Sequence, residues 1–335
     1  MNQQQIIRDG IKISLRRTLI FAAIVAVIVA NAGVKAYGEP GDIFASINGG
    51  PGNGAGAIFK YDPNGVQSMF AYGLDQPRGL AFDSVGNLFV ATNSCDENTW
   101  CHPTIVKITP GGTQSTFATI PDSFFAEGVA IDHSDNVYVM AIAWSNTVSI
   151  IFKITPQGER GSFGFVPGHG FDLAFDRTGD LFAADVTGQT IYRFAPDGRR
   201  SVFVGPEAFT KPETGPFGLA FDQFGNLFVS TAMYPNTADA ILKFTAKGVK
   251  RTFVSGLPNP RDLIFDSAGK LFVTEIPPSA SGDILKFTHR GEPTVFASDI
   301  GIQENSGPEY LAIEPGPIMT DFKMLSNGSH LQASR

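Results

Sequence analysis

Short runs of apolar residues recur along the chain, separated by turn residues. Residues 79–120 hold four runs rich in Val, Ile, Phe and Thr, which is the pattern of a four-stranded antiparallel sheet. Similar first runs begin at residues 79, 128, 172, 218, 262 and 310, which are 44 to 49 residues apart. A fixed period of this length predicts a repeat architecture with one sheet in each repeat.

Two turn motifs recur at fixed places within the repeat. Asp-x-x-Gly follows the first run, as at 83–86, and Thr-Pro-x-Gly follows the third run, as at 109–112. The Asp side chain can accept hydrogen bonds from its own turn, Pro presets φ, and Gly accepts a positive φ. These motifs predict tight hairpins that join the first strand to the second and the third to the fourth.

The two ends of the repeat array predict a closed ring. Residues 41–47 match the second run of the repeat, 58–65 the third and 68–73 the fourth, whereas the last copy stops after 310–314. Both faces of each sheet are apolar, so neighbouring sheets must cover them, and joining the ends leaves no sheet edge open. We therefore predict an all-β, six-bladed β-propeller of four-stranded antiparallel blades, closed by an N-terminal strand that completes the last blade.

The terminal segments differ in composition from the repeats. Basic residues precede an unbroken apolar run over 19–30, which indicates a secretory signal peptide over residues 1–36 and an extracytoplasmic (periplasmic or secreted) protein. The alternative is an uncleaved membrane anchor, which would be the chain's only contact with a membrane. The propeller is predicted over 37–317, and 318–335 form a polar C-terminal tail.

Charge and cysteine content limit the partners and the compartment. The formal net charge is −7, and the segment 1–36 is itself basic, so the propeller is more acidic still and nucleic-acid binding is disfavoured. We expect a monomer.

Cys95 and Cys101 lie in one loop and form a local disulfide in an oxidising compartment, with two free thiols as the alternative.

The variable loops and the channel mouth beside them form the default binding site. Tight turns emerge on one rim of the ring, and the opposite rim carries connections of varied length, where function usually lies. One residue enters each innermost strand at this rim: Arg78, Glu127, Phe171, Phe217, Arg261 and Glu309. Because the sixth blade adjoins the first, the order around the ring is Arg261, Glu309, Arg78 and Glu127, and the charges alternate.

Two interpretations of these charges stay open. In one, Glu127, Glu309 and Asp185, with Glu275 as a further candidate, offer oxygen ligands to Ca²⁺ or another divalent cation, and His169 acts as a base. In the other, the two arginines neutralise the carboxylates in an ion-pair network that fixes the arrangement of the blades, since carboxylates paired with guanidinium groups are poor metal ligands.

Histidine and aromatic residues on the variable loops are weaker candidates. His169 lies in a Pro-Gly-His-Gly loop that could present its imidazole to a ligand, or it could be a loop residue without a role. Trp100, Trp144 and Tyr234 could form an aromatic platform for a sugar or another flat ligand. Single exposed aromatic residues also occur without any function.

The phrase Pro-x-Gly-Leu-Ala-Phe-Asp-x-x-Gly-Asn-Leu-Phe-Val, at 77–90 and 216–229, resembles the NHL-type repeat and the related SMP-30/gluconolactonase propellers. The resemblance covers nearly the whole chain after the signal segment. It implies a fold that hosts lactonases, lyases, esterases and binding platforms. The resemblance to the SMP-30/gluconolactonase family also implies a divalent metal ion at the channel mouth, held there by Glu, Asn and Asp side chains. Glu127-Gly128 matches the Glu motif, but Arg78 and Phe217 stand where the Asp is expected, and no Asn-Gly opens an inner strand.

Two hypotheses for function follow, and whether the protein is an enzyme stays open. The first is an exported propeller that binds a small ligand or protein partner at its loop-rich rim. Its binding residues would be Arg78, Arg261, Glu309, Trp100, Trp144 and Tyr234. The alternative is a metal-dependent lactonase or esterase with Glu127, Asp185 and Glu309 as metal ligands and with His169 and Glu127 as catalytic groups. A virginiamycin B lyase-like activity is a more remote alternative.

Overall fold

The computed structural model describes most of the predicted propeller. The described residues are 41–48, 56–95, 101–145, 147–209, 215–232, 238–277, 281–301 and 307–315. The chain divides into two units, Met1–Gly38 and Glu39–Arg335, and the first unit lies outside the described residues together with the predicted signal peptide and polar tail. Within the described ranges, no helix has the length and apolar character needed to cross a membrane.

Twenty-four strands and one short 3₁₀ helix make up the described fold. The strands up to the third blade are β1 (Ile43–Ile47), β2 (Gly56–Tyr61), β3 (Gln67–Leu74), β4 (Leu80–Phe82), β5 (Leu88–Cys95), β6 (Cys101–Ile108), β7 (Gln114–Thr119), β8 (Phe124–Ile131), β9 (Val137–Ala143), β10 (Ser149–Ile154), β11 (Arg160–Val166), β12 (Gly170–Phe175), β13 (Leu181–Asp185), β14 (Thr190–Phe194) and β15 (Arg200–Val204). After the helix η1 (Pro206–Ala208) come β16 (Gly215–Phe221), β17 (Leu227–Ala232), β18 (Ala238–Phe244), β19 (Lys250–Pro258), β20 (Pro260–Phe265), β21 (Leu271–Glu275), β22 (Gly282–Phe287), β23 (Pro293–Ile300) and β24 (Pro308–Ile313).

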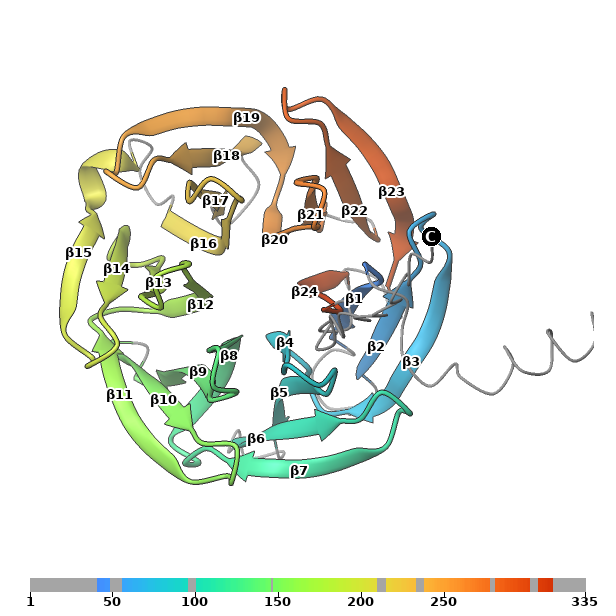
Figure 1. The fold of residues 1–335 in the computed structure, drawn as a ribbon, viewed down its shortest axis with the longest axis vertical. Helices are drawn as coiled ribbons and strands as arrows, with labels where there is room; N and C mark the ends of the chain where they lie inside the picture. The colour runs from blue at the N-terminus through green and yellow to red at the C-terminus, as the bar shows by residue number, and fades with distance from the viewer. Residues whose placement is uncertain are drawn as a thin grey trace, which may run out of the picture. The chain divides into compact units, whose positions relative to one another are not determined.

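These strands form six four-stranded antiparallel sheets arranged as a six-bladed β-propeller, which confirms the predicted fold class. Five blades are consecutive in the chain, and the sixth has the strand order β24-β1-β2-β3. Figure 1 shows the first strand of each repeat, β4, β8, β12, β16, β20 and β24, around the centre of the ring, with the fourth strands outside. Residues of all six inner strands line one cavity at the centre, which is called the channel below.

The N-terminal strand closes the ring as predicted. β1 pairs antiparallel with β24 on one side, from Ile43 opposite Ile313 to Ser46 opposite Tyr310, and with β2 on the other. A hydrogen bond from the Glu314 N–H to the Asp42 carbonyl, 3.1 Å, extends this pairing beyond the strands. The two ends of the array thus share one sheet.

The recurrent turns have the predicted hydrogen bonds. In the first blade, the Gly86 N–H donates to the Asp83 carbonyl at 3.2 Å, and the Asp83 carboxylate accepts the N–H of Asn87 at 2.7 Å. Gly86 has a φ of 84°, a left-handed conformation that glycine adopts without strain. The same carboxylate arrangement recurs at Asp132, Asp176, Asp222 and Asp266.

The hydrophobic core consists of six clusters, one between each pair of neighbouring blades. An aromatic residue on the second strand organises each cluster. In the sixth blade, Phe44 packs edge to face on Phe70 of the same blade and on Phe82 of the first blade, both with ring centroids 4.9 Å away. Tyr138, Phe182 and Phe228 repeat this bridge to the next blade, so aromatic pairs of this kind join the sheets at four of the six interfaces.

Truncation of a bridging ring should strongly destabilise the propeller. Phe44 is 2% exposed, so we expect Phe44→Ala to lower the free energy of unfolding by about 3–5 kcal/mol through lost burial and a cavity. The matched control is Phe224→Ala in an exposed turn, where the ring is 79% exposed and the change should stay within about 0.5 kcal/mol. Urea denaturation measures both, and equal effects would contradict the bridging role.

Candidate functional site

A break in strand pairing lies at the mouth end of five of the six inner strands. The pairing of inner and second strands shifts register between Ala126 and Val129, and likewise across Gly170–Leu173, Pro216–Leu219 and Pro260–Leu263. Such bulges redirect side chains and are common beside functional sites. β24 has a similar shift between Pro308 and Tyr310, so five of the six predicted mouth residues lie within these shifts: Glu127, Phe171, Phe217, Arg261 and Glu309.

Side chains from the second strands stabilise these irregular segments. The Ser230 hydroxyl accepts the Gly218 N–H at 2.8 Å and donates to the Arg261 carbonyl of the next blade. Ser46 accepts the Tyr310 N–H at 3.2 Å in the same way. The backbone groups released from the ladder are therefore satisfied, as buried polar groups must be.

The four charged mouth residues form a continuous ion-pair array in the predicted order. Arg261 contacts Glu309 at 2.8 Å, Glu309 contacts Arg78 at 3.4 Å, and Arg78 lies 4.0 Å from Glu127. Their side chains are between 7% and 22% exposed, so water screens the array only weakly. The last contact is the longest, and the Arg78 Nε is buried without a hydrogen-bond partner.

The two carboxylates of this array differ in pKa because their partners differ. Burial raises the pKa of Glu127, and the guanidinium of Arg78 offsets only part of that effect. Burial acts on Glu309 in the same direction, but Arg261 and Arg78 together outweigh it and lower the pKa of Glu309. Glu309 is therefore the carboxyl group that is held in its ionised form by two guanidinium groups. Glu127 has one guanidinium beside it and is protonated more readily.

A stack of planar groups forms the other half of the mouth. His169 lies flat on Phe171 with ring centroids 4.7 Å apart, and Phe171 meets Phe217 at 4.0 Å. The Arg261 guanidinium lies over the Phe217 ring, 4.5 Å from its centroid, so the stack joins the ion-pair array. Burial lowers the pKa of His169, which favours a neutral imidazole there.

Tyr310 links distant blades across the channel, and the sequence did not reveal this role. It belongs to β24 of the sixth blade, yet its hydroxyl donates to the Glu127 carboxylate at 3.1 Å. The same hydroxyl lies 3.4 Å from the Phe171 carbonyl of the third blade. The only signal in the sequence was a bulky residue where Gly79, Gly128 and Gly218 stand in other repeats.

Two buried aspartates occupy the same repeat position as Tyr310. Asp172 accepts the Leu219 N–H at 2.8 Å, and Asp262 accepts the Leu311 N–H at 2.6 Å, each from the following blade. Burial raises the pKa of Asp172 to about 7 and that of Asp262 well above its usual range. The sequence alone did not single out these carboxyl groups, because Asp172 and Asp262 appear in it only as the first residues of two repeats.

Asp185 and Glu275 lie at the ends of second strands, beyond the ion-pair array. Asp185 is 1% exposed and accepts hydrogen bonds from Gly188 N–H at 2.8 Å and the Thr187 hydroxyl at 3.2 Å. Burial raises the pKa of Asp185, and it raises the pKa of Glu275 to about 7. One carboxylate oxygen of each is buried without a hydrogen-bond partner.

The predicted metal site has little support in the described structure. Glu127 and Glu309 are occupied by guanidinium groups, and among the described residues no group of three or more His, Cys, Asp and Glu side chains could hold a metal ion. Paired carboxylates of this kind do not fit a divalent cation, so we derive no reaction step through one. Asp185 as a ligand stays a prediction.

The remaining predicted residues lie on the loops. Trp144 is 43% exposed and donates its indole N–H to the Asp122 carbonyl at 2.9 Å. Trp100 and Tyr234 lie outside the described residues, so the aromatic platform stays a prediction. Cys95 and Cys101 form the predicted disulfide between β5 and β6.

The fold and mouth together define a six-bladed β-propeller with an ion-paired channel. No protein-family model matches the sequence. No curated protein matches it either. Solved structures with the same fold include virginiamycin B lyase from Staphylococcus aureus, at 18% identity and a TM-score of 0.54 over 82% of this chain and 92% of that one.

Two other solved propellers belong to the class that the sequence resembles. A putative gluconolactonase is 18% identical, with a TM-score of 0.50 over 71% of this chain and 82% of that one. A calcium-binding protein, regucalcin, from Agrobacterium tumefaciens is 12% identical, with a TM-score of 0.51 over 71% and 86%. At these identities the similarity establishes the fold alone.

Removal of the central cation of the array should destabilise the protein. Arg78→Ala removes the guanidinium that pairs with Glu127 and one of the two that pair with Glu309. Loss of one partner of a buried ion pair lowers the free energy of unfolding by about 3–5 kcal/mol. The control is Arg199→Ala, whose side chain is 82% exposed in its pair with Asp197 and whose loss should leave the melting temperature unchanged. Thermal unfolding compares them, and an unchanged melting temperature in Arg78→Ala would exclude a stabilising array.

The buried aspartates should make stability fall as pH rises. Because the folded pKa of Asp172 is raised to about 7, the folded state binds more protons than the unfolded state between about pH 4 and pH 7. The free energy of unfolding then decreases across that window. Asp172→Asn should have a flatter profile in denaturant titrations at each pH, whereas the exposed Asp299→Asn should follow the wild-type slope. Parallel profiles for wild type and Asp172→Asn would contradict the raised pKa.

Proposed function

We propose that the protein binds a small molecule at the channel mouth, through a hydrogen-bond-accepting group such as a carboxylate or a lactone carbonyl. The observation that carries this proposal is the incomplete contact between Arg78 and Glu127. The Arg78 Nε has no hydrogen-bond partner, and the nearest carboxylate oxygen of Glu127 is 4.0 Å away. The Arg78 side chain is 17% exposed, so its guanidinium can donate a charge-assisted hydrogen bond to a ligand oxygen at the mouth.

The surroundings of Arg78 favour a ligand with a planar or apolar body. Phe125 lies under the guanidinium of Arg78 at 5.4 Å, and the stack of His169, Phe171 and Phe217 forms the opposite half of the mouth. Aromatic faces beside a few convergent polar groups are the usual lining of small-molecule sites. A protein partner docking on the same rim would use the same groups through a side chain.

The proposal places the protein outside the cytoplasm. The basic and apolar N-terminal segment 1–36 supports export by its pattern, and the Cys95–Cys101 disulfide is of the kind that persists in oxidising compartments. An exported monomer with a loop-rich rim would meet ligands directly from the surroundings.

Catalysis at the same mouth is the second candidate. His169 stacks on Phe171 beside the array with a lowered pKa, so a neutral imidazole is available as a base, and Glu127 has a raised pKa suited to proton transfer. The similar folds of the virginiamycin B lyase and the putative gluconolactonase favour a lyase or a lactone hydrolase. The paired carboxylates argue against a metal-dependent mechanism, although regucalcin binds calcium on this fold.

Substitution of Arg78 by lysine should remove binding without unfolding the protein. Arg78→Lys keeps the positive charge near Glu309 but loses the Nε donor and the planar group. With gluconate and gluconolactone as probes in calorimetric titrations, we expect at least a tenfold weaker affinity. Arg199→Lys is the exposed control and should bind as the wild type does.

The same samples separate binding from catalysis. Release of gluconate from gluconolactone above the spontaneous rate, lost in Glu127→Gln, would replace the binding proposal with hydrolysis. A melting temperature raised by millimolar Ca²⁺ would show a metal site by mass action, contrary to our expectation. Equal affinities in wild type and Arg78→Lys would remove Arg78 from the site.

A further inference from the structure

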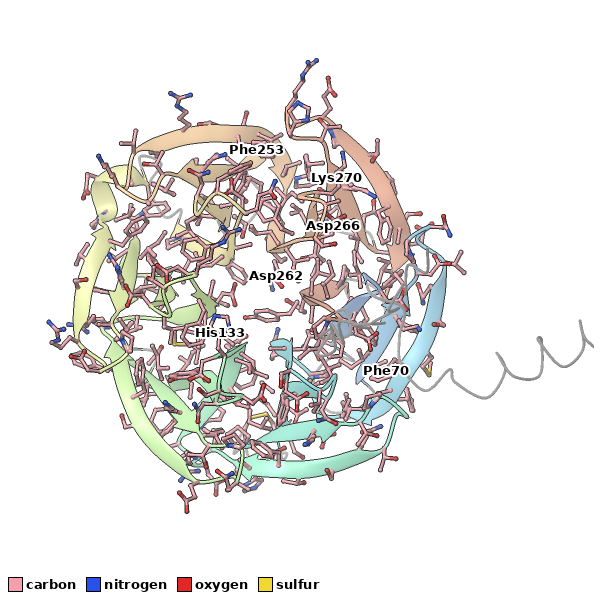
Figure 2. All side chains as sticks on the ribbon, viewed as in Figure 1. Phe70, His133, Phe253, Asp262, Asp266 and Lys270 are labelled. Carbon is pink, nitrogen blue, oxygen red and sulfur yellow. A yellow bond between two sulfur atoms is a disulfide. The ribbon has the colours of Figure 1, made fainter. Side chains whose placement is uncertain are left out.

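We propose that the inner channel beneath the mouth is a second binding site, for a small organic ammonium ion with a compact apolar body. This inference is independent of the function proposed for the mouth. It rests on a cavity inside the ring, on the character of its walls, and on two carboxyl groups that line it. Figure 2 shows one of these residues, Asp262, among the side chains at the centre of the ring.

The cavity has a volume of about 210 Å³ and is lined by all six inner strands. Each strand contributes an aliphatic residue at the equivalent position of its repeat: Leu80, Val129, Leu173, Leu219, Leu263 and Leu311. These residues lie beyond the mouth array in the chain direction, toward the uniform turns. For comparison, a cavity of about 150 Å³ with apolar walls accommodates benzene. The space therefore suits an organic molecule of that size.

Asp172 and Asp262 supply the polar part of the lining, together with Tyr310. Both aspartates are 6% exposed and come from the third and fifth blades. Each accepts one backbone N–H from the following blade, at 2.8 Å and 2.6 Å, which leaves further acceptor capacity on each carboxyl group. Two acceptors at the side of an apolar cavity match an ammonium group attached to an apolar body.

The lining holds no cationic side chain to balance these carboxyl groups. The nearest arginines in the chain, Arg78 and Arg261, precede this level by one residue in their repeats and contact Glu127 and Glu309 at the mouth. A buried carboxylate without a counter-charge is costly. Burial accordingly raises the pKa of both Asp172 and Asp262. A neighbouring acid raises each pKa further, Glu127 that of Asp172 and Asp172 that of Asp262. A bound ammonium ion would stabilise the ionised forms.

The geometry favours an organic cation over a metal ion. Ca²⁺ takes six to eight oxygen ligands, whereas this lining offers two carboxyl groups and one phenol among aliphatic residues. The other three repeats have glycine at the position of Asp172. At Gly79, Gly128 and Gly218 an added Cβ would lie within 2.6 Å of a neighbouring backbone atom, so these repeats add no further ligands.

Benzylammonium is the probe that tests this site, with benzyl alcohol as the neutral and benzoate as the anionic analogue. In calorimetric titrations at pH 7 we expect benzylammonium to bind best in the channel and benzoate not to bind there; benzoate held at the mouth would be lost in Arg78→Lys and kept in Asp172→Asn. Binding should release protons, so the measured heat should vary with the ionisation enthalpy of the buffer. Asp172→Asn and Asp262→Asn should each weaken benzylammonium binding at least tenfold. The Asn side chains of both variants still carry an oxygen that can accept the N–H of Leu219 or Leu311, so the variants should fold.

Two further variants locate the bound probe. Arg78→Lys keeps the positive charge at the mouth and removes no lining residue, so it should weaken benzylammonium binding less than Asp172→Asn does, whereas Ala174→Leu adds volume to the cavity lining and should weaken binding. The proposal is overturned if benzylammonium fails to bind at millimolar concentration, if the two Asn variants bind like the wild type, or if only Arg78→Lys loses binding. Equal affinity for benzyl alcohol would show an apolar cavity without cation recognition. If an Asn variant does not fold, the proton release and the ranking of the three probes on wild-type protein decide.

Discussion

The packing of one blade against the next is the constraint on which the structure depends. Each sheet is apolar on both faces and has no core of its own, so the six clusters between blades are the entire hydrophobic interior of the described ring. Rings such as Phe44 contact both their own blade and the following one. A blade without two neighbours would leave such rings in water, which explains why the last strand must pair with the first.

Ring closure also creates the site. Six inner strands surround one axis, and shifts in their pairing with the second strands coincide with mouth residues such as Glu127 and Arg261. Charged side chains brought together at low exposure must pair, and with two of each sign they form the array Arg261, Glu309, Arg78 and Glu127. Because Glu309 lies between two guanidinium groups and Glu127 beside one, a repeated scaffold acquires two chemically different carboxyl groups.

The channel changes character with depth. At the mouth, opposite charges compensate one another beside an aromatic stack. One residue deeper, Tyr310 reaches from the last blade to Glu127, so the strand that closes the ring also orients a carboxyl group at the mouth. At that depth Asp172 and Asp262 border an apolar cavity without a cation. Small changes at equivalent repeat positions thus produce two distinct chemical environments on one axis.

The sequence by itself determined the six repeats, the four strands in each, the turns, the closure by residues 41–47 and the order of the charges around the mouth. These features depend on local periodicity and on neighbouring repeats, which a linear pattern records. Only the tertiary structure decided which charges touch, that Tyr310 crosses to Glu127 and Phe171, and that Asp172 and Asp262 are buried in the channel. Those contacts join residues 47 to 231 positions apart, and their distances depend on how the blades pack and on bulges that change which way a side chain points.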